Sequence, residues 1–123
     1  MDRALPRKPL IAIVEDDPAV RHSLAFDLEA QGYAICAFDS ALKALECARL
    51  ADIDCLVIDY GLPDVHGAAL LGRLRVRGVR CPAVFIASNP TQRCLNDVSA
   101  TGSPLIEKPL LGGALGDQIR ALL

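Results

Sequence analysis

Charged and polar side chains stand where four short apolar runs of this sequence end. One run leads directly into Glu15 and Asp16, and a second run ends on Asp59. A third is followed by Ser88, and a fourth, very short run precedes Lys108. Three carboxylates, a hydroxyl and an ammonium group can bind a divalent cation and stabilise a phosphoryl group if one site gathers them.

The clustered carboxylates set the chemistry of such a site. Three neighbouring carboxylates do not all stay ionised without a cation, because like charges raise each other's pKa. Their hard oxygens favour Mg²⁺, which keeps several waters and accepts phosphate oxygens. An aspartate such as Asp59 can itself attack phosphorus and form an acyl phosphate. Mg²⁺ and Lys108 would neutralise charge on the transferring group, and Ser88 would hydrogen-bond one of its oxygens.

The apolar runs alternate with segments of helical period. Strands are predicted at 10–14, 33–38, 55–59, 83–87 and 104–107. Helices are predicted at 18–31, 40–49, 65–77, 91–100 and 110–123. Almost continuous apolar strands are buried on both faces, so the pattern indicates one α/β domain over residues 1–123 with a five-stranded parallel sheet between helices. The common doubly wound, flavodoxin-like strand order is 2-1-3-4-5.

The strand order explains why charged residues follow apolar runs, because ligands of such sheets bind beyond the carboxyl ends of the strands. Asp17, one residue further on, is instead expected to cap the first helix. Asp39 or Ser40 is expected to cap the second helix, which is predicted to continue through Arg49. Asp64 is expected to cap the third helix.

The composition excludes several classes of function. Hydrophobic residues make up 52% and charged residues 23% of the chain, and the net charge is −2. This balance is typical of a globular protein and gives no overall basic field for nucleic acid or an anionic membrane. The apolar runs are shorter than the roughly 18 residues of a membrane span, and the amino terminus lacks a signal-peptide pattern. We therefore expect a cytoplasmic protein.

The cysteines and histidines do not form a metal-binding pattern. The five cysteines are an odd number without a CxxC pair: Cys36, Cys47, Cys55, Cys81 and Cys94. Several lie in apolar runs, where a reduced thiol behaves as a small hydrophobic group. Neither His22 nor His66 lies at ligand spacing from a cysteine, which argues against a zinc site. His22 is expected to be exposed on a helix, and His66 to lie in a loop.

Four segments carry a family resemblance. IAIVEDD, CLVIDYGLPDVHG, AVFIAS and LIEKP, in this order and spacing, resemble the receiver domain of two-component response regulators. Each motif alone is a weak signal, but four in register on the expected strands are specific, and the resemblance spans essentially the whole chain. Pro63 and Gly67 also match the family's loop after the third strand, where Gly lets the backbone pass closely.

The resemblance implies a phospho-acceptor and a metal site. Asp59 corresponds to the acceptor, which would take a phosphoryl group from a histidine kinase or a histidine phosphotransfer protein. Glu15 and Asp16 correspond to the acidic pair that holds Mg²⁺. Asp59 and the backbone carbonyl of Gly61 would complete the protein ligands.

The resemblance also implies a switch, although two positions depart from the family pattern. Ser88 corresponds to the switch hydroxyl and Lys108 to the family's lysine, and the Lys108–Pro109 peptide bond is expected to be cis. The residue after the hydroxyl, normally Ala or Gly, is Asn89, whose amide could narrow access or hydrogen-bond the phosphoryl group. The second switch position, normally Tyr or Phe, is Leu105, so the family's aromatic rotation cannot take place.

Two further departures concern the loop at the site and the last helix. Gly61 offers no side chain over the acceptor. Three glycines, at 112, 113 and 116, each cost roughly 1 kcal/mol relative to Ala within a helix. The last helix is therefore expected to start late, near Ala114. The resemblance implies that the output face lies here, so a variant readout is expected.

The resemblance indicates a signalling domain, not an enzyme with a separate substrate. Phosphorylation of Asp59 would shift the conformation of the output face and change its affinity for a partner. The sequence does not identify the output partner, or an output domain that would act in its place. It shows no helix-turn-helix, and we expect no direct binding to nucleic acid or membrane. A homodimer that forms on phosphorylation is compatible with the resemblance.

Two alternatives belong to other classes. Asn89 and Leu105 favour a pseudo-receiver, which binds a partner without being phosphorylated. An aspartate-nucleophile phosphatase would need a second carboxylate two residues after the nucleophile as general acid, and that position is Gly61.

Overall fold

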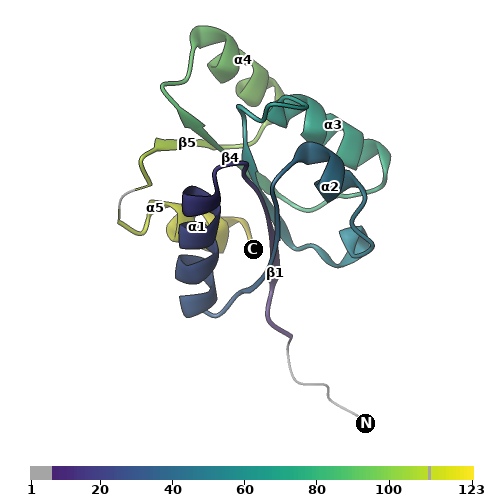
Figure 1. Cartoon of the computed structure of the whole chain (residues 1–123), viewed down its shortest axis with the longest axis vertical. Coiled ribbons are helices and arrows are strands. Elements are labelled where there is room, and N and C mark those ends of the chain that lie inside the picture. The colour runs from purple at the N-terminus through teal and green to yellow at the C-terminus, as the bar shows by residue number, and fades with distance from the viewer. Residues whose placement is uncertain (1–6, 111) are drawn as a thin grey trace.

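The computed structural model describes residues 7–110 and 112–123. Its strands are β1 (Leu10–Val14), β2 (Ala34–Phe38), β3 (Cys55–Asp59), β4 (Ala83–Ser88) and β5 (Leu105–Lys108). Its helices are α1 (Pro18–Ala30), α2 (Ala41–Leu45), α3 (Gly67–Val76), α4 (Gln92–Thr101) and α5 (Ala114–Leu122), with a short 3₁₀ turn, η1 (Leu50–Asp52), before β3. Strands and helices alternate along the chain as predicted (Figure 1).

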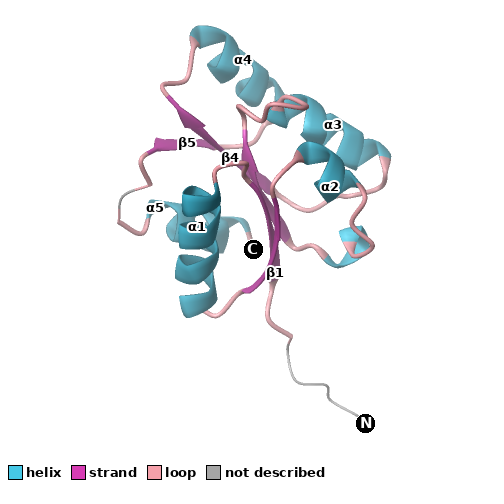
Figure 2. Ribbon diagram, viewed as in Figure 1, coloured by secondary structure: helices cyan, strands magenta, loops and turns pink. Residues whose placement is uncertain are grey.

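The five strands form one parallel sheet in the order β2-β1-β3-β4-β5, which confirms the predicted α/β fold. Ile13 of β1 lies opposite Ala37 of β2 on one side and Val57 of β3 on the other. Helices α1 and α5 cover one face of the sheet, and α2, α3 and α4 cover the other (Figure 2). Because β1 and β3 are parallel neighbours, their carboxyl ends meet at one edge.

The central strands are buried on both faces. Ile11 and Ile13 pack in the apolar layer beneath α1 and α5, whereas Ala12 and Val14 pack in the layer beneath α2, α3 and α4. Every residue of β1 and β3 is buried. Burial of each large aliphatic side chain contributes about 2 kcal/mol. The residues at the ends of these two strands are therefore held in place by a well-packed sheet.

Most helix ends follow the predicted local chemistry. The Asp17 carboxylate accepts hydrogen bonds from two backbone N–H groups in the first turn of α1, at 2.9 and 3.4 Å, which confirms its capping role. At α2 the cap is Ser40 and not Asp39, because the Ser40 hydroxyl accepts from the N–H of Lys43 at 3.2 Å. Helix α5 starts at Ala114, as the glycines predicted.

The predicted length of the second helix was wrong. α2 ends at Leu45 and does not continue through Arg49. The chain leaves the helix so that Leu50 and Ile53 pack against the apolar layer ahead of β3. Tertiary packing outweighs helix propensity over these residues.

The predicted role of Asp64 was also wrong. Its carboxylate accepts hydrogen bonds from the N–H groups of Ala41 at 3.2 Å and Leu42 at 3.0 Å, at the start of α2 and not of α3. Burial alone would raise the pKa of Asp64, but these backbone hydrogen bonds lower it. His66 occupies the N-cap position of α3 and makes no side-chain capping bond. Asp64 thus fastens the loop after β3 to the start of α2.

The cysteines are free thiols. Cys55 and Cys94 are buried, and the other three are half-buried. Burial raises the pKa of Cys55 to about 12, so it is an uncharged apolar side chain at neutral pH. None of the helices in the described part of the chain has both the length and the apolar character that crossing a bilayer requires.

Candidate functional site

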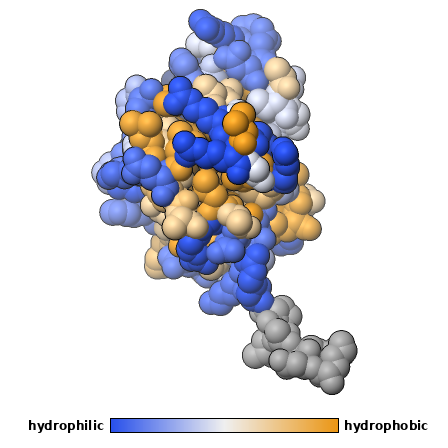
Figure 3. All heavy atoms as spheres, turned by 90° about the vertical axis from the view of Figure 1, so that its right-hand side faces the viewer, coloured by the Kyte–Doolittle hydropathy of each residue, from blue (hydrophilic) through white to orange (hydrophobic). Residues whose placement is uncertain are grey.

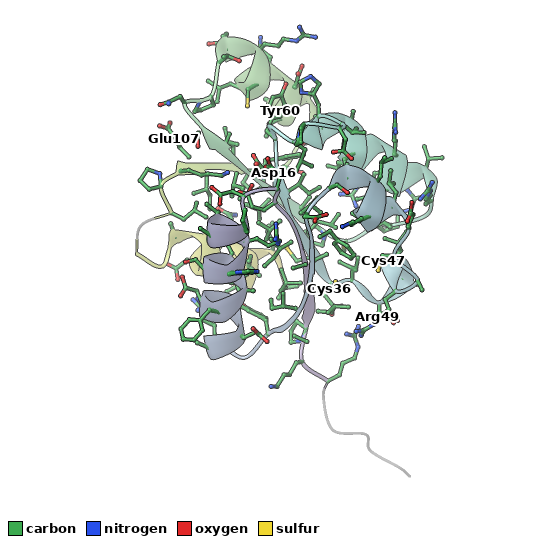
Figure 4. All side chains as sticks on the ribbon, in the orientation of Figure 1. Asp16, Cys36, Cys47, Arg49, Tyr60 and Glu107 are labelled. Atoms are coloured by element: carbon green, nitrogen blue, oxygen red, sulfur yellow. The ribbon has the colours of Figure 1, made fainter. Side chains whose placement is uncertain are left out.

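Three carboxylates converge at the carboxyl ends of β1 and β3. Glu15 is fully buried, Asp59 is 6% exposed and Asp16 is exposed. Carboxylate oxygens of these three residues lie within 4.8 Å of one another. Figure 4 shows Asp16 at this edge of the sheet, on the same side as Tyr60, the residue that follows β3. The strand order therefore brings Asp59 next to Glu15 and Asp16, which lie 44 and 43 positions earlier in the sequence.

Lys108 joins the cluster from the end of β5. Its Nζ lies 2.6 Å from Oε1 of Glu15 and 3.3 Å from Oδ2 of Asp59. Burial by itself lowers the pKa of Lys108, but the hydrogen bond to Glu15 and the charge of Asp59 outweigh it and raise the pKa above its ordinary value. Lys108 is therefore a permanent cation at this site. The peptide bond from Lys108 to Pro109 is cis.

The site holds more negative charge than Lys108 can neutralise. The pKa of Glu15 is raised to about 7, first by burial and then by the hydrogen bond and charge of Asp59, which outweigh the lowering by the Lys108 contact. Three carboxylates beside one ammonium leave an excess of negative charge at the site, which a divalent cation would compensate. Oxygen ligands within 4.8 Å of one another, one of them exposed to water, suit a divalent cation such as Mg²⁺.

The loop after β3 is fixed closely around Asp59. The Gly61 N–H donates to Oδ1 of Asp59 at 3.1 Å, and the Gly67 N–H donates to the carbonyl of Tyr60 at 2.9 Å. A Cβ on Gly67 would lie 2.7 Å from the Asp59 carbonyl and 2.8 Å from the Tyr60 Cα, so only glycine fits. The close approach expected at Gly67 is therefore confirmed.

A cavity opens over Asp59 between the loops that follow β3 and β4. Its lining includes Ser88 and Asn89, which follow each other at the end of β4, and Cys94 in the first turns of α4. Ser88 pairs in register with Lys108 of β5. Asn89 adopts a left-handed conformation with φ 45°, which asparagine tolerates better than most residues. The structure therefore places both Ser88 and Asn89 at the cavity, as expected.

Leu105 lies elsewhere. It is half-buried on β5, pairs in register with Phe85 of β4 and packs against the apolar layer beneath α2, α3 and α4. It is not among the residues that line the cavity over Asp59. A switch role for Leu105 would require a conformational change, so that hypothesis remains a prediction.

One polar contact at the site was missed by the sequence analysis. The Tyr60 hydroxyl donates to Oδ2 of Asp97 on α4 at 2.6 Å. This hydrogen bond, with burial, raises the pKa of Tyr60 to about 12. The Tyr60 ring also lies 5.5 Å from the His66 ring, tilted by 40°. The residue after Asp59 thus ties the loop beyond β3 to α4, a link between residues 37 positions apart.

Comparison with known proteins defines the class. The family model of the response regulator receiver domain matches residues 11–120. The chain belongs to this family. It is 30% identical over 120 residues to the transcriptional regulatory protein FixJ of Azorhizobium caulinodans, a match that covers 97% of this chain and 57% of FixJ. It is 26% identical to the transcriptional regulatory protein CreB of Escherichia coli, over 95% of this chain and 52% of CreB.

Solved structures share the fold. The crystal structure of FixJ-N, 29% identical, superposes with a TM-score of 0.81 over 94% of this chain and 93% of that one. The chemotaxis protein CheY4 of Vibrio cholerae, 18% identical, superposes with a TM-score of 0.86 over 94% and 99% of the two chains. The chain spans about half the length of the curated relatives it matches.

Proposed function

We propose that this receiver domain takes a phosphoryl group onto Asp59 from a phosphohistidine of a histidine kinase or a histidine phosphotransfer protein. The observation that carries the proposal is the position of the Asp59 carboxylate. It lies beside the ammonium of Lys108 and within 4.8 Å of the carboxylates of Glu15 and Asp16, at the floor of an open cavity. An aspartate in such a place can act as a nucleophile toward phosphorus.

The transfer needs few steps from the protein. An Asp59 carboxylate oxygen attacks the phosphorus, the new P–O bond forms, and the P–N bond to the donor imidazole breaks with its electron pair returning to the ring. Bound Mg²⁺ would supply charge neutralisation for the phosphoryl oxygens, held by Glu15, Asp16, Asp59 and the Gly61 carbonyl. Lys108, whose Nζ lies 3.3 Å from Oδ2 of Asp59, supplies a second cation.

Two residues of the cavity would bind the transferred group. Ser88 stands at the end of β4 in register with Lys108, where its hydroxyl can donate to a phosphoryl oxygen once the group arrives. Asn89 beside it adds an amide that can donate in the same way. New bonds to these two residues would shift the loop after β4, and with it α4.

The movement of α4 would be the signal. Phosphorylation biases a conformational equilibrium only if a phosphoryl group interacts differently with two states. We expect the Ser88–Asn89 loop to provide this difference, because it lines the cavity over Asp59 and leads directly into α4. The output would be altered affinity for a partner. The curated relatives FixJ and CreB are named transcriptional regulatory proteins.

The proposal is tested by mass spectrometry of the intact protein after incubation with acetyl phosphate. We expect a mass increase of one phosphoryl group in the presence of Mg²⁺, and none when Mg²⁺ is chelated. The Asp59→Asn variant keeps the shape of the side chain and should not gain mass. Absence of an adduct together with absence of Mg²⁺ binding would favour a phosphorylation-independent interaction module. Continuous release of phosphate from many substrates would favour a phosphatase.

A further inference from the structure

The charges of this chain are unevenly distributed, and the excess of positive charge lies on α3. Residues 65–96 hold five of the chain's 13 cationic side chains and none of its 15 carboxylates. Four of the five are arginines at the end of α3 and just beyond it: Arg73, Arg75, Arg77 and Arg80. None of these four forms an ion pair with a carboxylate of residues 7–110 or 112–123.

Two of these arginines have a structural role. The Arg75 guanidinium donates to the carbonyls of Val79 and Cys81, and the Arg77 guanidinium donates to the carbonyl of Leu45. Arg75 thus satisfies backbone carbonyls just beyond α3, and Arg77 satisfies a carbonyl at the end of α2, where a cation is favourable. Arg73 and Arg80 are exposed, and their side chains donate to no other residue in the described part of the chain. The fold of the domain does not account for them.

Exposed apolar side chains lie beside the arginines. A groove between α2 and α3 is lined by Leu42, Leu45, Glu46, Arg73, Val76 and Arg77. Val76 is 89% exposed and Leu42 is 53% exposed, and both are large apolar side chains. Figure 3, which faces the α2–α3 side of the molecule, shows hydrophobic residues gathered at the middle of this surface and hydrophilic residues around them.

The exposed face of α3 also carries small residues. Ala69 and Gly72 are exposed on it, and a Cβ added to Gly72 would meet no atom within 4 Å. Glycine inside a helix costs roughly 1 kcal/mol relative to Ala, and no contact within the domain offsets that cost. A surface that combines small residues, an exposed valine and unpaired arginines resembles a docking face more than a solvated helix face.

We propose that the groove between α2 and α3 binds an acidic amphipathic helix of a partner protein. The apolar side of that helix would pack on Leu42 and Val76, and its carboxylates would pair with Arg73. Charge complementarity selects an acidic partner, because the described residues that line the groove include two arginines, Arg73 and Arg77, against the one carboxylate of Glu46. A nucleic acid would satisfy the arginines but would leave the two apolar side chains against phosphates and sugars. The proposal does not depend on phosphorylation of Asp59.

The test uses the full chain and a synthetic peptide of about 18 residues, close to five helical turns, with leucines along one side and glutamates elsewhere. Backbone amide shifts in NMR spectra locate the bound peptide, and a titration gives its affinity at low and high salt. We expect shifts on α2 and α3, saturable binding, and weakening by salt. A scrambled peptide of the same composition should bind at least about tenfold more weakly.

Matched variants decide between a helix site and general attraction. Arg73→Glu and Val76→Asp alter exposed side chains and should each weaken peptide binding by at least about tenfold. Arg120→Glu makes the same change of charge on α5 and should leave the affinity within about twofold. Equal binding of the scrambled peptide, or shifts centred on α1 and α5, would overturn the proposal. It would also fail if a DNA duplex competed fully and Val76→Asp had no effect.

Discussion

The cluster at the carboxyl end of the sheet and the arginines of α3 are both groups of charges, but their surroundings differ. Glu15 is fully buried, and its carboxylate contacts Lys108 at 2.6 Å. Arg73 and Val76 stand in water, with Val76 89% exposed. Buried charges interact strongly and must be paired within the fold, whereas exposed charges interact weakly and remain available. Burial therefore decides which charges the fold uses and which are left for a partner.

The largest effect is expected from removing the cation of the buried cluster. Lys108→Met leaves Glu15 and Asp59 facing each other without compensation, and breaking a buried pair in this way costs about 3 kcal/mol in the free energy of unfolding. Phosphorylation of Asp59 by acetyl phosphate should fall at least about 100-fold, because a fixed cation beside the transferring group is lost. Urea denaturation and intact-mass kinetics measure the two effects.

The control for this variant is Lys43→Met. Lys43 pairs with Asp39 at 3.0 Å, but both side chains are largely exposed. Its loss should change the free energy of unfolding by no more than about 0.5 kcal/mol. If Lys108→Met and Lys43→Met were equally mild, the contrast between buried and exposed pairs would be wrong.

The next effect is on the pH dependence of stability in the absence of divalent cations. The pKa of Glu15 is raised from 4.5 to about 7, mainly by burial and then by Asp59. Between these values the folded state binds more protons than the unfolded state, so stability falls as the pH rises from 4.5 through 7. The loss between pH 5 and pH 8 should be on the order of 2–3 kcal/mol. Denaturation of the parent protein between pH 5 and pH 8 measures it.

Glu15→Gln supplies the comparison for this pH effect. The variant has no carboxyl group to titrate at that position, so its stability should vary much less over the same range. Mg²⁺ should stabilise the parent more at pH 8 than at pH 5.5, because it binds the ionised carboxylate. A parent protein that became more stable as the pH rose through this window would contradict the raised pKa.

A smaller effect is expected at Tyr60, the residue that follows Asp59. Tyr60→Phe removes the 2.6 Å hydrogen bond to Asp97 and should cost about 1 kcal/mol. Hydrogen exchange of the α4 amides should become faster, because Tyr60 fastens that helix to the loop after β3. Tyr33→Phe, at the edge of the apolar layer beneath α1, is the matched control and should leave α4 exchange unchanged.

The smallest effect is expected on α3. Arg73→Gln removes an exposed charge that pairs with no carboxylate in the described part of the chain, so the free energy of unfolding should change by less than about 0.5 kcal/mol. Thermal unfolding measures this directly. A loss comparable to that of Lys108→Met would mean that Arg73 stabilises the fold and is not free for a partner.

The sequence predicted the site better than its surroundings. Glu15, Asp16 and Asp59 follow apolar runs, and one strand order suffices to bring them together. The role of Asp64 could not be read in the same way, because its partners Ala41 and Leu42 lie more than 20 residues away. Local capping rules predicted that Asp64 caps the nearest helix, α3, whereas in the folded chain its carboxylate binds the start of α2.

Two other features were missed because they also depend on contacts between residues far apart in the sequence. The early end of α2 depends on Leu50 and Ile53 reaching the apolar layer, and the Tyr60–Asp97 hydrogen bond depends on where α4 lies against the loop after β3. Periodicity and strand order describe elements one at a time. Contacts between elements follow only once the elements are packed.

The most direct test of the central claim is to locate the phosphoryl group. Treatment of the phosphorylated chain with borohydride reduces an aspartyl phosphate to homoserine, and peptide mass mapping then identifies the modified position. We predict homoserine at residue 59, dependent on Mg²⁺ during phosphorylation and absent from Asp59→Asn. Modification at another carboxylate, or uptake that persists in Asp59→Asn, would contradict the assignment of Asp59 as the acceptor.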